Sequence, residues 1–106
     1  MIDEHLLKEV VNRIVAAAKP SRVILFGSYG RDKPDKRSDL DIMVVKAEVT
    51  DKAAEIVRLH EVVGDVGTGV DVLVYSDEEF DRRSRVPGTV LYWARKEGRP
   101  LYEAAH

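Results

Sequence analysis

The stretch Val23–Val45, VILFGSYGRDKPDKRSDLDIMVV, decides how the rest of this chain is organised. It contains two apolar runs, Val23–Phe26 and Ile42–Val45, separated by a polar segment that begins with Gly27 and Ser28. A short uninterrupted apolar run is typical of a buried strand that is covered on both faces. The stretch therefore predicts two neighbouring strands in the core of an α/β fold.

Two aspartates, Asp39 and Asp41, stand two positions apart at the start of the second run. Because side chains alternate along a strand, both carboxylates are expected on one face, while Leu40 points toward the core. Two like charges about 4 Å apart repel by roughly 4 kcal/mol at an effective dielectric constant near 20. A divalent cation relieves this repulsion, and Mg²⁺ typically binds one or two carboxylates together with substrate phosphates. The pair therefore predicts a magnesium site.

The end of the first run fits a phosphate. A strand that stops at Gly27-Ser28 and turns into a short helix at Tyr29 would aim free backbone N–H groups at an anion. Glycine lets the backbone approach a phosphate closely, and the Ser28 hydroxyl adds a donor. Arg31 could add a bidentate contact. Gly27, Ser28 and Arg31 are therefore the candidate nucleotide-binding residues, beside the metal carboxylates.

Gly27-Ser28, a ten-residue spacer and Asp39-x-Asp41 together resemble the signature of the DNA polymerase beta-like nucleotidyltransferase superfamily. The short length of the chain and its sequence motif GSYGR…SDLDIMVV resemble those of the minimal nucleotidyltransferase (MNT) branch of this superfamily. This branch comprises the MntA-like antitoxins that pair with HEPN-domain toxins. The resemblance covers nearly the whole chain. It implies a nucleotidyltransferase fold, ATP as substrate, and two Mg²⁺ ions, with Mn²⁺ as a possible replacement, bound by the paired aspartates.

The same resemblance implies a third carboxylate on a later strand, and Asp71 in the segment Val70–Val74 occupies the matching position. Asp39, Asp41 and Asp71 are then the catalytic and metal-binding residues, and Asp71 acts as, or orients, the base for the incoming hydroxyl. The alternative is that the three aspartates are solvated charges at exposed strand ends. Asp71 weakens that alternative, because it interrupts an apolar strand between Val70 and Val72.

Composition narrows the class of protein further. The chain has 106 residues, 44% of them hydrophobic and 34% charged, and no cysteine. We expect one domain, residues 1–106, without disulfides or a thiolate metal site, in the cytoplasm. No apolar run reaches the roughly 20 residues of a membrane span. The net charge of −2 gives no basic footprint for direct binding of a nucleic acid.

Periodicity predicts a small mixed sheet of three strands flanked by helices. The expected strands are Val23–Phe26, Asp39–Val45 and Val70–Tyr75, and Leu101-Tyr102 is either an edge strand or a tail. The expected helices are Asp3–Lys19, a short one from Tyr29, Asp51–Val63 after a Thr50 N-cap, one after the Ser76–Glu79 capping box, and a last one opened by Pro87. In the helix Asp51–Val63 the expected buried positions are Ala54, Ile56, Val57, Val62 and Val63.

The leading functional hypothesis is Mg²⁺-dependent transfer of AMP from ATP to a tyrosine hydroxyl of a partner HEPN toxin, which makes this chain the antitoxin. Two alternatives stay open. The chain could neutralise its toxin by binding alone, without turnover, or it could be a metal-dependent phosphodiesterase. Neither the oligomeric state nor the preferred base follows from the sequence.

Overall fold

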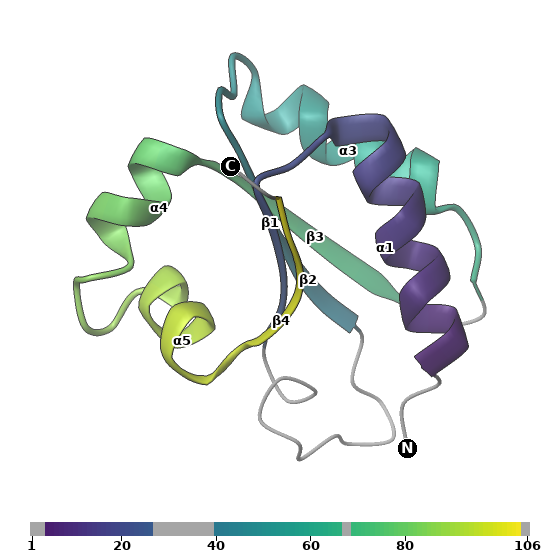
Figure 1. Ribbon diagram of the computed structural model, residues 1–106. Coiled ribbons are helices and arrows are strands. Elements are labelled where there is room, and N and C mark those ends of the chain that lie inside the picture. Colours follow the sequence, from purple (N-terminus) through teal and green to yellow (C-terminus); the bar gives the residue numbers. More distant parts are fainter. Residues whose placement is uncertain (1–3, 27–39, 67–68, 105–106) are drawn as a thin grey trace.

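A four-stranded mixed sheet in the order β3-β2-β1-β4 lies between two layers of helices (Figure 1). The computed structural model describes residues 4–26, 40–66 and 69–104. The elements are α1 (Glu4–Ala18), β1 (Arg22–Phe26), β2 (Leu40–Lys46), α3 (Lys52–Val63), β3 (Val70–Ser76), α4 (Asp77–Arg83), α5 (Val90–Glu97) and β4 (Arg99–Glu103). The predicted α/β class and mixed sheet are confirmed. The helix expected from Tyr29 lies outside the described residues.

The sheet is buried on both faces because its two central strands carry apolar side chains at almost every position. On one face Leu40, Ile42 and Val44 of β2 pack under α1 and α3 in a single hydrophobic cluster. On the other face Met43 and Val45 pack with Phe80 of α4 and with Leu91 and Ala94 of α5. Figure 1 shows the two helix pairs on opposite sides of the sheet. The uninterrupted apolar run predicted this double cover.

Strand direction sets which residues meet at each end of the sheet. β1 and β2 run antiparallel, whereas β2 and β3 run parallel. A parallel pair requires a crossover connection, and α3 provides it. The N-terminal ends of β2 and β3 therefore lie side by side, next to the C-terminal end of β1.

β4 forms a fourth strand where the sequence left the choice between an edge strand and a tail. It pairs antiparallel with β1, and the register shifts between Val23 and Ile24, so that Leu101 is an extra residue in β4. Such a bulge re-aims side chains, and Leu101 and Tyr102 both pack against the cluster under α1. Pro100 lies in this strand, which agrees with an edge position because proline has no backbone N–H to donate to a neighbouring strand.

The starts of two helices differ from the prediction. The N-cap of α3 is Asp51, not Thr50: its carboxylate accepts a hydrogen bond of 3.1 Å from the Ala54 N–H. α5 begins at Val90 rather than at Pro87, because the Thr89 hydroxyl accepts the Tyr92 N–H at 3.1 Å. In both cases a side-chain acceptor closer to the first helical turn satisfies the free donors.

The buried side of α3 also differs from the prediction. Leu59 and Val63 are buried, one helical turn apart, whereas Ala54 and Val57 are exposed. The expected set mixed two sides of the helix, since Val57 lies two positions from Leu59 and therefore faces away from it. Ile56 is partly buried against the cluster under α1 and α3.

Gly98 allows α5 to approach the sheet closely. It ends α5, as predicted, with φ of −70°. A Cβ at this position would lie 2.2 Å from the Ala94 carbonyl oxygen and 2.6 Å from Cγ2 of Ile24. The requirement for glycine here is therefore one of space and not of backbone conformation.

Within the described ranges no helix is long and apolar enough to cross a bilayer.

A half-buried ion cluster ties α3 to the C-terminal end of β2. Glu55 accepts a hydrogen bond of 2.5 Å from Nε of Arg58 and pairs with Lys46, and its side chain is only 13% exposed. The Arg58 hydrogen bond lowers the pKa of Glu55 from 4.5 to about 2; burial opposes this, and Lys46 reinforces it. A depressed pKa means that the ionised carboxylate stabilises the folded state.

This cluster predicts a pH-dependent loss of stability. The contribution of Glu55 is fully present above pH 4.5 and disappears as the pH falls toward about 2. We expect Glu55→Gln to reduce the free energy of unfolding by about 1–2 kcal/mol at pH 7 and by much less at pH 3. Thermal unfolding at both pH values measures the difference.

Glu9→Gln is the matched control, since Glu9 pairs with Arg13 on the open surface of α1. Exposed pairs contribute about 0–1 kcal/mol. A difference between wild type and Glu55→Gln that stays constant from pH 7 to pH 3 would contradict the assigned role of Glu55.

Candidate functional site

Asp41 and Asp71 lie opposite each other on neighbouring strands. In the parallel pairing of β2 with β3 they are register partners, and across the antiparallel pairing with β1 Asp41 is the partner of Phe26. Neighbouring strands are about 4.8 Å apart. The two carboxylates and the aromatic ring therefore form one row across three strands.

Strand periodicity places this row on the sheet face that α4 and α5 cover. Asp41 lies on the same face of β2 as Met43 and Val45, which pack under α4 and α5, and the partly buried Phe26 packs against the same cluster. Asp71 lies on the same face of β3 as Tyr75, which also contacts that cluster. Both aspartates therefore point away from α1 and α3.

The helix layer leaves the aspartate end of this face open. Along β2 on this face, Asp41 is partly exposed, whereas Met43 and Val45 are fully buried. Along β3, Asp71 is exposed and Leu73 is partly exposed. The cover by α4 and α5 thus ends between Asp41 and Met43, and a ligand has access to the row of carboxylates.

A backbone hydrogen bond fixes the two strands at this end. The N–H of Leu40 donates to the carbonyl of Gly69 at 2.9 Å, one residue before Asp41 in β2 and two residues before Asp71 of β3. This bond holds the register in which the aspartates are opposite. Two carboxylates on adjacent strands, reached from solvent, are the hard oxygen donors that Mg²⁺ prefers. The donor set therefore fits a divalent cation bound between β2 and β3.

Four of the predicted site residues, Gly27, Ser28, Arg31 and Asp39, lie outside the described residues. Their positions along the chain connect them to the row, because Gly27 follows Phe26 and Asp39 precedes Leu40. Among the described residues alone, no group of three His, Cys, Asp or Glu side chains could hold a metal ion. Asp41 and Asp71 are thus the part of the predicted carboxylate triad that the structure places.

Phe26 is a site neighbour that the sequence analysis did not single out. It is partly buried, and it flanks Asp41 on the side opposite Asp71. An apolar ring beside a carboxylate lowers the local dielectric constant and so strengthens its attraction for a cation. The sequence feature that could have identified Phe26 is its spacing of two residues from Ile24, which places both side chains on one face of β1.

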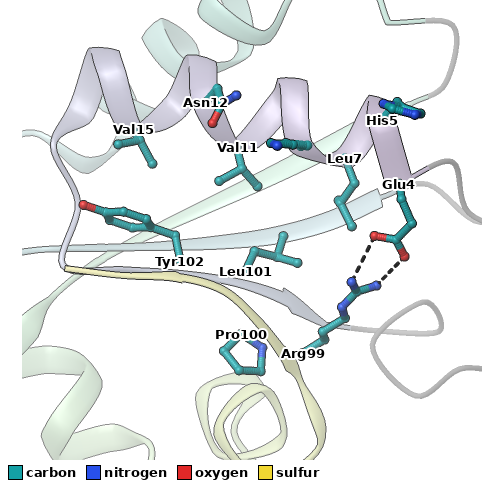
Figure 2. A pocket seen from close by; sticks show the side chains of 11 residues that line it. Glu4, His5, Leu7, Val11, Asn12, Val15, Arg99, Pro100, Leu101 and Tyr102 are labelled. Carbon is teal, nitrogen blue, oxygen red and sulfur yellow. Dashed lines mark hydrogen bonds and ion pairs between the residues drawn. The ribbon is translucent and has the colours of Figure 1, made fainter. Parts of the chain in front are cut away.

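A cavity of about 500 Å³ lies elsewhere, between α1 and the edge strand β4. Figure 2 shows Leu101 and Tyr102 pointing from β4 toward Val11 and Val15 of α1. At one end Arg99 and Glu4 form a bidentate ion pair with distances of 2.8 and 3.0 Å. This groove lies on the α1 face of the sheet, so it is separate from the row that contains Asp41 and Asp71.

Comparison with known proteins agrees with this architecture. Residues 7–101 match the family model described as a nucleotidyltransferase domain, and the chain therefore belongs to this family. Over 109 aligned residues, the chain is 28% identical to a Methanocaldococcus jannaschii protein named as a candidate protein adenylyltransferase. The alignment covers 96% of this chain and the whole length of that protein.

Solved structures show the same fold. A candidate nucleotidyltransferase from Sulfolobus solfataricus superposes with a TM-score of 0.60 at 27% identity, over 92% of this chain and 86% of that one. A toxin–antitoxin structure with AMP-PNP gives a TM-score of 0.59 at 21% identity, over 92% and 73% of the two chains. A mutant of the toxin–antitoxin MntA–HpeT gives 0.61 at 19% identity, over 97% and 75%.

The site predicts that ATP and a divalent cation bind together. ATP should raise the melting temperature only when Mg²⁺ or Mn²⁺ is present, because the cation neutralises the carboxylates that otherwise repel the triphosphate. A ligand at 100 times its Kd stabilises by about 2.7 kcal/mol. We expect the double variant Asp39→Asn/Asp41→Asn to lose this shift in differential scanning fluorimetry.

Asp81→Asn is the control, since Asp81 is an exposed aspartate of α4 with no part in the row. It should keep the full shift. Equal stabilisation by ATP in EDTA and in Mg²⁺ would show that the carboxylates do not act through a cation.

Proposed function

We propose that this chain is a Mg²⁺-dependent protein adenylyltransferase that transfers AMP from ATP to a tyrosine hydroxyl of a partner HEPN toxin. The observation that carries the proposal is the register pairing of Asp41 with Asp71 on the open end of a nucleotidyltransferase sheet. The similarity to a candidate protein adenylyltransferase supports protein as the acceptor class. The fold likeness to a toxin–antitoxin structure with AMP-PNP supports an adenine nucleotide and a toxin partner.

Asp41, together with Asp39, holds the cation and orients the triphosphate. In the proposed arrangement Gly27 and Ser28, which follow β1, donate to the phosphate oxygens, and Arg31 adds a charged contact. Bound metal supplies charge neutralisation at the α-phosphate and at the leaving pyrophosphate. Phe26 borders Asp41 and limits the access of water on that side.

Asp71 has a different task because it lies on β3, across the row from β1. It accepts the proton from the tyrosine hydroxyl as the oxygen attacks the α-phosphorus. A P–O bond forms to the tyrosine oxygen, the bond between the α-phosphorus and the bridging oxygen breaks, and pyrophosphate leaves with the electron pair. Its exposed position suits a group that meets an incoming acceptor.

A partner protein is the acceptor that best fits the described surface. Among the described residues, Asp41 is partly exposed and Asp71 is exposed, so an acceptor carried by another protein can reach them. A hydroxyl presented by a folded partner is positioned by that partner, which also supplies the missing wall. AMP attached to a toxin tyrosine adds bulk and negative charge where an RNA phosphate approaches, and this would block RNA cleavage.

The division of roles between the aspartates predicts separable effects on binding and transfer. Asp71→Asn should keep measurable binding of ATP with Mg²⁺ and lower the transfer rate at least about 100-fold, the scale of a lost general base. Isothermal titration calorimetry and a rate assay with α-labelled ATP give the two quantities. If Asp71→Asn loses nucleotide binding as fully as Asp39→Asn/Asp41→Asn, Asp71 is a metal ligand first.

The reaction itself predicts a mass change on the toxin. Incubation of the HEPN toxin with this chain, ATP and Mg²⁺ should add one or more AMP units, as read by intact-mass spectrometry. Asp39→Asn/Asp41→Asn should add none. A toxin that is inactivated at unchanged mass would show that the chain neutralises by binding alone, and the transferase proposal would then fail.

A further inference from the structure

The segment 82–96, which joins the end of α4 to the end of α5, is rich in basic residues and lies between two exposed acidic residues, Asp81 and Glu97. It contains Arg82, Arg83, Arg85, Arg95 and Lys96 and no Asp or Glu. The rest of the chain then has twelve Lys and Arg residues against all 19 Asp and Glu residues. The small net charge of the whole protein therefore conceals a concentration of positive charge in this segment.

Much of this positive charge is not neutralised within the described ranges. Arg83 pairs with Glu79 at 2.9 Å, but Arg82 and Arg85 are exposed and have no carboxylate partner among the described residues. Arg95 reaches only the Ser84 hydroxyl, at 3.5 Å, and Lys96 donates to the Tyr92 hydroxyl at 3.2 Å. The guanidinium groups of Arg82 and Arg85 are thus available to an external anion.

Large apolar side chains are exposed in the same segment. Val86, in the turn before α5, is 51% exposed, and Val90 and Trp93 of α5 are 36% and 40% exposed. Val90 and Trp93 are three residues apart and share one side of the helix. Leu91 and Ala94, on the other side, are buried against the sheet. Exposed Trp, Val and Arg side chains in one short segment are typical of a protein–protein interface, in which Trp and Arg contribute most.

We propose that the 82–96 surface is the docking site for an acidic face of the partner protein, whose apolar side chains cover Trp93 and Val90. The proposal rests on the proposed function for the identity of that partner, the HEPN toxin. It adds which surface of this chain binds the toxin and the charge that the toxin must present there.

A second copy of this chain does not fit the surface equally well. A two-fold contact brings each patch against itself, and here that would place the basic segment against the basic segment. A single-stranded nucleic acid gains affinity by stacking bases on open aromatic faces. Tyr92 is already engaged by the edge of Trp93, with ring centroids 5.3 Å apart, and by Lys96. The exposed valines gain nothing from a nucleic acid but do gain from a protein.

The position of the surface agrees with delivery of an acceptor to the aspartates. α4 and α5 cover the same sheet face that carries Asp41 and Asp71, and α5 packs directly on β1. A partner that rests on this helix layer approaches the uncovered end of that face. A partner bound to the groove of α1 and β4 would instead lie on the opposite face (Figure 2).

The test measures binding separately from transfer. The probe is the HEPN-domain protein that the proposed function expects to be encoded beside the gene of this chain, titrated without nucleotide by calorimetry; a neighbouring gene for another class of protein would overturn the proposal. Trp93→Ala should weaken binding about 30-fold, and Arg82→Glu/Arg85→Glu should weaken it about tenfold and reduce its salt dependence. The retained ATP·Mg²⁺ shift in melting temperature shows that each variant is folded.

Matched controls make the same chemical changes on the opposite face. Val57→Ala removes an exposed apolar side chain of α3, and Lys8→Glu/Lys19→Glu makes the same change in net charge at exposed positions in and just after α1. Both should bind like the parent chain. Test variants that bind normally, or controls that weaken binding equally, would overturn the assigned surface.

Two further outcomes test whether the 82–96 surface binds the toxin. If tRNA binding falls with Arg82→Glu/Arg85→Glu while toxin binding does not, the surface is for nucleic acid and the proposal fails. It fails likewise if the parent chain does not bind the HEPN protein. Normal, surface-dependent toxin binding without AMP addition would refute the proposed transferase activity and leave the docking surface standing.

Discussion

Parallel pairing of β2 with β3 is the constraint on which the rest of this structure depends. It requires a crossover, which α3 supplies, and it brings the starts of the two strands to the same end of the sheet. Asp41 and Asp71 become neighbours only through this pairing, since they are 30 positions apart in the sequence. An antiparallel pairing over the same length would place Asp71 at the far end of β2, opposite Val45.

The helix layer of α4 and α5 covers only part of the aspartate face, and the part that it leaves uncovered contains the aspartates. Met43 and Val45 need α4 and α5 to exclude water from that face of β2, and Gly98 lets α5 come close enough to Ile24 to do so. A longer cover would bury Asp41 without water around it, which is costly for a carboxylate. The same packing that stabilises the core thus stops where the charged row begins.

Continuous apolar runs made the strands predictable, and a two-residue alternation placed Asp41 on the face opposite Leu40. Register was not predictable, because it depends on long-range pairing: no local signal in Val70–Val74 says that Asp71 meets Asp41 rather than a residue two positions away. The prediction of where helices start was wrong for a local reason. Thr50 and Asp51 both suit an N-cap, and the choice depends on which one reaches the Ala54 N–H. Sequence reasoning also passed over Phe26, whose place beside Asp41 exists only in the folded sheet.

The negative aspartate row and the positive segment 82–96 are separated in this chain, and neither the composition nor the fold class reveals this. The aspartate row is negatively charged, whereas the segment 82–96 on the same side of the sheet is positively charged. If the basic residues paired with the aspartates, they would compete with the metal; instead Arg83 pairs with Glu79, and Arg82 and Arg85 face outward. Under the proposed function, this separation leaves one end of the face for a metal-bound triphosphate and the adjacent helix layer for a protein. A partner that is acidic where it rests on α4 and α5 would be attracted by Arg82 and Arg85 and repelled by Asp71 if it slid along the sheet, so the two opposite charges together would fix its position.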